Sequence, residues 1–228
     1  MRVAVLITFL CALGLSAIAQ SGPPPLCKPC LFYGGDLDQT DPNSDGSYNE
    51  ITLSDPGSQT YAAITVPNGH AVLIEGMLFQ TLFQLTQKLD PKEVTWEIRT
   101  GNVFANGGTL VASGGGPVAM QATGRQIDGE LEYTLATKVS PSVQLTGGTY
   151  WFNLTPLCTN RHDPSCKTAA YYVSNTTHLA NAFRGTAQPG GVALINSPFR
   201  GYQWESICSL GLRGCSWLSF GLMGKVVQ

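Results

Sequence analysis

The chain has 228 residues and a formal net charge of -2 at pH 7, and only 12% of its residues are charged, against about a quarter in an average soluble domain. This near-neutral balance creates no field that would attract a polyanion, so we expect no nucleic-acid partner. The hydrophobic content of 43%, with 9% aromatic residues, excludes a disordered chain.

Residues 1–19 have the pattern of a secretory signal peptide. Arg2 precedes an apolar run, and Ala17 and Ala19 are the small residues that signal peptidase reads. A membrane anchor is the alternative, but the apolar run from Val3 is short for a span and has no basic flank after it. We therefore expect cleavage after Ala19, secretion to the extracellular medium or the periplasm, and no membrane span in the mature chain.

Removing residues 1–19 would take away Cys11 and leave six of the seven cysteines, an even number. Cysteines of exported proteins usually oxidise, so we expect loop-pinning disulfides between sequence neighbours, in the pairs Cys27–Cys30, Cys158–Cys166 and Cys208–Cys215. One alternative is a redox-active Cys27-Lys28-Pro29-Cys30 motif, although it lies in a Pro/Cys leader, residues 20–30, rather than at the start of a helix. A second alternative is a zinc site that joins these two cysteines to Cys158, His162 and Cys166.

An acidic loop follows the leader, at residues 36–46. Asp41, Asn43 and Asp45 alternate and precede a glycine, as in the opening of a calcium-binding loop. Asp36 and Asp38 would complete the oxygen shell, but residue 52, where such a loop has a bidentate Glu, is a threonine. We expect Ca²⁺ here and no other cofactor; the alternative is a solvated acidic turn.

Apolar and polar residues alternate along the rest of the chain, and clusters of Gly, Pro, Asn and Asp interrupt them, which predicts an all-β protein. Hairpin turns are expected at 106–108, 128–129 and 146–148. Residues 31–228 should form one domain, an antiparallel two-sheet β-sandwich of jelly-roll type, with Trp96, Ile98, Phe152 and Leu154 inside. Strands are expected at residues 48–53, 61–66, 71–79, 94–99, 109–113, 118–123, 130–136, 143–145, 149–155, 169–173, 202–205 and 217–223.

Three of these segments, 94–99, 108–114 and 145–154, resemble the hallmark strands of a group of secreted bacterial β-sandwich proteins. Many members of that group carry a sorting anchor of the PEP-CTERM type. Residues 196–199 and 220–224 resemble its final strands. The resemblance implies export and a sandwich fold but no activity, and because this chain ends without the anchor we expect it to be released or held by a partner.

Carboxylates offer one enzymatic hypothesis. Asp128, Glu130 and Glu132 are two residues apart, so in a strand they share a face, where they could serve as acid and nucleophile in a polysaccharide hydrolase. The alternative is an outward polar face of an antiparallel strand, with Leu131, Tyr133 and Leu135 turned to the core.

Aromatic residues offer a binding hypothesis. Aromatic residues recur in two adjacent pairs and one group, so some of their rings should point away from the core and could stack on sugars. They are Tyr150–Trp151, Tyr171–Tyr172, and Phe199 with Tyr202 and Trp204. The alternative is that they lie under long loops. We expect a secreted, non-catalytic surface or extracellular-matrix interaction protein that binds polysaccharide or cell-surface glycan, with the hydrolase as the alternative.

Overall fold

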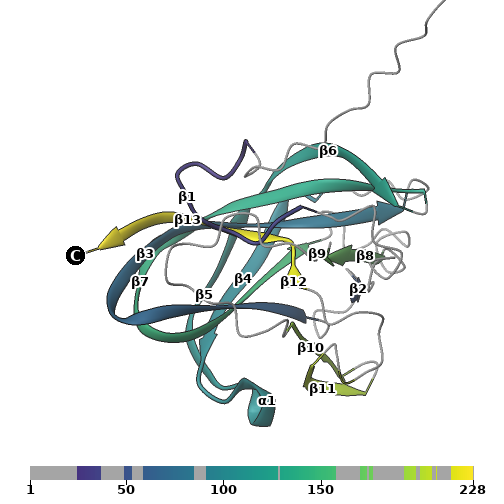
Figure 1. The fold of residues 1–228 in the computed structure, drawn as a ribbon. Coiled ribbons are helices and arrows are strands. Elements are labelled where there is room, and N and C mark those ends of the chain that lie inside the picture. Colours follow the sequence, from purple (N-terminus) through teal and green to yellow (C-terminus); the bar gives the residue numbers. More distant parts are fainter. Residues whose placement is uncertain are drawn as a thin grey trace, which may run out of the picture.

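The computed structural model is an antiparallel all-β structure with one short helix (Figure 1). It describes residues 25–36, 49–52, 59–84, 91–127, 129–157, 170–173, 175–176, 193–198, 201–206, 209 and 217–227. Every strand pairing within these ranges is antiparallel, as predicted. The elements are β1 (Cys30–Tyr33), β2 (Asn49–Thr52), β3 (Gln59–Gln84), β4 (Glu93–Thr100), α1 (Val103–Asn106), β5 (Thr109–Pro117), β6 (Ala119–Ile127), β7 (Glu130–Leu157), β8 (Ala170–Val173), β9 (Asn175–Thr176), β10 (Leu194–Ser197), β11 (Tyr202–Ser206), β12 (Trp217–Leu218) and β13 (Phe220–Val227).

Two strands are much longer than the sequence pattern predicted. β3 has 26 residues and β7 has 28, and they pair from Ala62 with Phe152 to Gln84 with Glu130. The pairing register shifts twice along β3, and both strands curve around the core (Figure 1). The turn expected at 146–148 is therefore wrong, because these residues continue β7 through its bend. Gly147 is needed there for close approach, since a Cβ would lie 2.8 Å from Asn68 Cα.

The main sheet has the order β1-β13-β3-β7-β4-β5. Strand β10 pairs with the start of β3 and also with β11. Strand β8 pairs with the end of β3 and also with β2. Strand β6 pairs with the start of β7, and β9 and β12 form a separate two-stranded sheet. The first and second halves of β3 and β7 thus have different neighbours.

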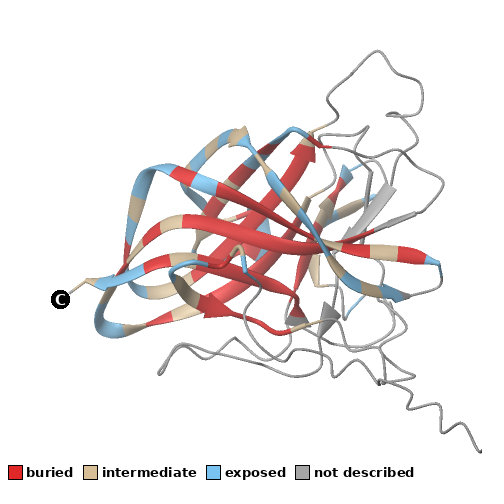
Figure 2. Ribbon diagram, turned by 90° about the horizontal axis from the view of Figure 1, so that it is seen from above, coloured by how far each residue is buried: buried red, intermediate tan, exposed pale blue. Residues whose placement is uncertain are grey.

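One large apolar core is built from buried residues of the strands. Figure 2 shows the buried residues distributed along the long curved strands. Trp96, Ile98, Phe152 and Leu154 are buried in this core, which confirms the predicted interior positions. Phe220 of β13 packs its ring against that of Phe152, at 6.4 Å between centroids. The last strand therefore closes the same core that β4 and β7 build.

Candidate functional site

The hairpin of β6 and β7 carries the carboxylates that were candidates for hydrolysis. Asp128 lies outside the described residues, whereas Glu130 is 7% exposed and Glu132 is 0% exposed. Tyr133 and Leu135 face the main core, as predicted, whereas Leu131 is partly exposed and is not among the residues of that core. The outward orientation expected for Glu130 and Glu132 is wrong, because this face of β7 is buried as well.

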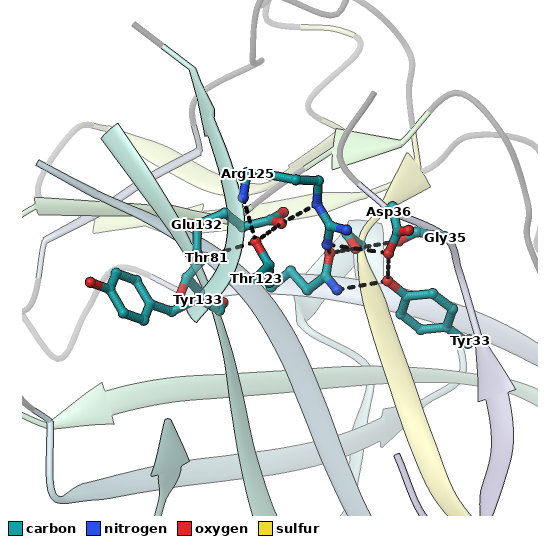
Figure 3. A network of polar contacts seen from close by, with 10 residues as sticks. Tyr33, Gly35, Asp36, Thr81, Thr123, Arg125, Glu132 and Tyr133 are labelled. Atoms are coloured by element: carbon teal, nitrogen blue, oxygen red, sulfur yellow. Dashed lines mark hydrogen bonds and ion pairs between the residues drawn. The ribbon is translucent and has the colours of Figure 1, made fainter. Parts of the chain in front are cut away.

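Arg125 of β6 is the group that Glu132 faces (Figure 3). Its Nε donates to Glu132 Oε2 at 2.6 Å, and Thr123 Oγ1 donates to the same oxygen at 2.8 Å. The other end of the guanidinium points to Asp36, with Nη2 3.2 Å from Oδ1. Burial lowers the pKa of Arg125, but attraction to Glu132 and Asp36 outweighs it and leaves the pKa raised, so the guanidinium stays charged.

Neutral side chains complete these contacts. Tyr33 donates its hydroxyl proton to Asp36, and Gln80 Nε2 donates to the Tyr33 oxygen at 2.6 Å. Gln80 Oε1 accepts from Arg125 Nη2 at 3.0 Å and from Ser219 Oγ at 2.7 Å. Burial, and then the hydrogen bond to Asp36, raises the pKa of Tyr33, so its phenol stays protonated. We call Tyr33, Asp36, Gln80, Thr123, Arg125, Glu132 and Ser219 the Arg125 network.

The Arg125 network connects segments that are far apart in the chain. It joins the end of β1 to β3, β6 and β7 and to the residue before β13. Glu132 is fully buried and paired with Arg125, so a polysaccharide chain could not reach it. The Arg125 network therefore has the geometry of a buried structural contact between distant segments, and not that of an accessible catalytic pair.

The aromatic residues predicted to bind a ligand are attached to different parts of β3. Tyr171 and Tyr172 lie in β8, opposite Phe83 and Leu82 at the end of β3. The structure describes the backbone of these two tyrosines but not their side chains. Tyr202 is half-buried and packs against the main core. Trp204 is brought together with polar side chains, among them Arg99.

Trp204 has an unusual backbone. Its φ is +55°, and among the described residues other than glycine it alone has a positive φ. The ring lies 5.3 Å from the ring of Tyr61, and the guanidinium of Arg99 lies 4.9 Å from its centroid. Gly107, which ends α1 at φ +81°, leaves room for the indole, because a Cβ there would lie 2.4 Å from Trp204 Cζ2. Such a strained residue persists only where its surroundings fix it.

Glu97 and Arg99 of β4 stand beside this ring. Arg99 Nε donates to Glu97 Oε2 at 2.7 Å, and Arg99 Nη1 donates to the Gly107 carbonyl at 2.9 Å. The Tyr61 hydroxyl lies 2.9 Å from Glu97 Oε2 and from Gln59 Oε1. The side chains of Arg99 and Glu97 remain 19% and 23% exposed. We call Gln59, Tyr61, Glu97, Arg99, Gly107 and Trp204 the Trp204 cluster.

Two side chains of the Trp204 cluster, Tyr61 and Arg99, have raised pKa values. Burial, and then the charge of Glu97, raises the pKa of Tyr61, so the phenol remains a donor. Burial lowers the pKa of Arg99, but the hydrogen bond to Glu97 and the attraction to it leave the pKa raised. At neutral pH Tyr61 is therefore a neutral donor and Arg99 a charged donor.

A second aromatic group lies next to the cluster. Trp151 is buried with Tyr61, and Trp204 packs against the same small core. Phe104 of α1 meets the Trp151 ring edge-on at 5.5 Å and is 46% exposed. Helix α1, which the sequence pattern did not predict, thus places an open ring beside the Trp204 cluster.

The remaining site predictions fall largely outside the described residues. Asp38, Asp41, Asn43 and Asp45 lie there, and Asp36 already faces Arg125 and Tyr33. Within the described ranges no group of three or more His, Cys, Asp and Glu side chains is placed to hold a metal ion.

The disulfide Cys27–Cys30 is present, which confirms one predicted pair. Cys158, Cys166, Cys208 and Cys215 lie outside the described residues, as does the signal segment.

The chain matches no protein-family model, and a search of curated proteins finds no match. The resemblance to the PEP-CTERM-type group therefore stays a prediction. Within the described ranges no helix is both long and apolar enough to cross a membrane.

Proposed function

We propose that this is a secreted, non-catalytic surface or extracellular-matrix interaction protein that binds carbohydrate through the Trp204 cluster. Sugar rings are recognised by a flat aromatic ring together with fixed hydrogen-bonding groups at its rim. The cluster has both, since Trp204 is partly exposed and Glu97 and Arg99 are partly exposed beside it.

The observation that carries the proposal is the left-handed backbone of Trp204 at φ +55°. Non-glycine residues at positive φ cost free energy and gather at ligand sites. In this protein the strained backbone places the Trp204 indole against Arg99 and Gly107. Because Glu97 balances the charge of Arg99, we propose neutral rather than acidic sugars as ligands.

Two further points belong to this proposal. Residues 1–19 would direct export and be removed. The two halves of β3 and β7, which have different neighbours, would form the two layers of a sandwich. The hydrolase alternative loses support, because Glu130 and Glu132 are buried.

A glycan array tests the proposal, combined with an assay for released reducing sugar. The protein should bind neutral glycans without releasing sugar. Trp204→Ala and Glu97→Gln should each lower binding at least tenfold, and Val226→Ala, which changes an exposed apolar residue on β13, should not. Thermal melting would confirm that each variant is folded. Absence of glycan binding, or equal binding by folded Trp204→Ala and Glu97→Gln variants, would refute the proposal.

A further inference from the structure

The guanidinium of Arg99 keeps hydrogen-bond donors that the protein does not use. A guanidinium has five N–H groups. Arg99 Nε donates to Glu97 Oε2, Nη1 donates to the Gly107 carbonyl, and the guanidinium also faces the Tyr61 hydroxyl. These three contacts leave at least two N–H groups without an acceptor in the described part of the chain. The Arg99 side chain is 19% exposed, so a ligand can approach it.

The carboxylate side of the same pair is short of a proton. The Tyr61 hydroxyl has one proton but lies 2.9 Å from both Glu97 Oε2 and Gln59 Oε1. Glu97 Oε1 receives only a long contact from Gln59 Nε2, at 3.4 Å. Turning the Gln59 amide around would supply Tyr61 but would set Gln59 Oε1 against Glu97 Oε1, so in either orientation one contact between two oxygens has no proton. A ligand O–H donated to Glu97, which is 23% exposed, would offset this shortage.

These spare groups decide which ligand chemistry fits. A carboxylate or phosphate has only acceptors and would meet the charge of Glu97, whereas an ammonium group has only donors and would meet the charge of Arg99. A hydroxyl both accepts and donates. The spare groups of Arg99 and Glu97 lie on either side of the contact between Nε and Oε2, so two hydroxyls on adjacent carbons would span them.

We propose, on the basis of the carbohydrate binding proposed above, that the Glu97–Arg99 pair selects glycans with free hydroxyls on two adjacent ring carbons, a vicinal diol. One hydroxyl accepts from Arg99 and its neighbour donates to Glu97, while the Trp204 ring contacts the apolar face of the same sugar. Hexose polymers linked 1,4 or 1,6 have a vicinal diol on every ring, whereas within a 1,3-linked chain the free hydroxyls are not adjacent. The site therefore distinguishes linkages among neutral sugars.

The neutral-glycan array, extended with linear polymers of glucose, mannose and galactose linked 1,4, 1,6 and 1,3, tests this selection. A duplicate array is oxidised with periodate, which cleaves vicinal diols, and is then reduced with borohydride. The protein should bind 1,4- or 1,6-linked chains at least about tenfold more tightly than 1,3-linked chains of the same sugar, because a site built to bond hydroxyls rejects a ligand that lacks one of them. Oxidation should abolish this binding.

Variants test the pair itself, since oxidation also opens the sugar ring. Arg99→Lys lacks the planar fork and Glu97→Gln lacks the carboxylate, so each should lose the preference for 1,4- over 1,3-linked chains. Glu75→Gln makes the same change in the exposed pair with Lys225 and should keep the preference. Thermal melting identifies the variants that are folded.

The outcomes separate this selection from carbohydrate binding as such. Glycan binding without the linkage preference, or binding that survives oxidation, would overturn the diol selection and leave carbohydrate binding standing. A folded Arg99→Lys or Glu97→Gln variant with the full preference would overturn the role of the pair. Absence of binding to every glycan would overturn both proposals.

Discussion

Replacing Glu132 with Gln tests whether the Arg125 network stabilises the fold. Glu132 is 0% exposed and the Arg125 side chain is 14% exposed, so the 2.6 Å ion pair between them is buried. Removing one partner of a buried pair costs about 3 to 5 kcal/mol, because the other charge stays buried. Asp36 still faces Arg125 at 3.2 Å, so we expect the lower end, about 3 kcal/mol. In a domain of this size that corresponds to a melting temperature lower by about 6 to 12 °C.

A matched control has the same chemical change at the surface. Glu75 lies 4.0 Å from Lys225, with side chains 41% and 64% exposed, and exposed pairs contribute about 0 to 1 kcal/mol. In urea denaturation, Glu132→Gln should therefore show a large loss of stability and Glu75→Gln a small one. Adding Arg125→Met to Glu132→Gln should cost less than the sum of the two single changes. Equal losses in the two Gln variants would refute the reasoning. Loss of sugar release without loss of stability in Glu132→Gln would restore the hydrolase.

Three further predictions concern the core, a phenol and the acidic loop. Trp96→Ala should lower the free energy of unfolding by about 3 to 5 kcal/mol in urea denaturation, and a loss below 1 kcal/mol would contradict its burial. The fold raises the pKa of Tyr33 above 10.0, so the contribution of this phenol to stability is present below about pH 10 and is lost as the pH rises further. The Tyr33→Phe variant should therefore lose less free energy of unfolding than the unaltered protein between about pH 9 and pH 11. Equal losses in the two proteins would contradict this. Calcium should raise the melting temperature, and Asp41→Ala with Asp45→Ala should abolish that rise; identical melting curves in calcium and in chelator would reject the site.

The all-β class could be predicted from the sequence because the alternation of apolar and polar residues in β4 and β7 indicates which side chains are buried. Trp96 and Phe152 were placed correctly on that basis. The continuity of β3 could not be predicted, since its turn-like residues 67–70 remain in the strand. Those residues favour a break locally, but pairing with β7 on either side of them carries the strand through the bend.

The candidate sites were only partly predictable for a related reason. Alternation with the buried Trp96 and Ile98 puts Glu97 and Arg99 on one face of the strand 94–99, but only the fold brings Tyr61 and Trp204 to them. The positive φ of Trp204 has no sequence signal, because it depends on Gly107 and α1. The burial of Glu132 was missed because alternation cannot show that a second element covers the polar face of a strand.

Two Arg–Glu ion pairs among the described residues have the same chemistry and differ in exposure. Glu132 with Arg125 has almost no access to water, so its charges can act only on the protein that surrounds them. Glu97 with Arg99 keeps about a fifth of each side chain exposed and lies against an indole in a strained conformation. A ligand can replace water only where water reaches, so of these two pairs Glu97 with Arg99 is the one open to the ligand that we propose. The same argument separates the buried carboxylates of β7 from the partly open Trp204 cluster.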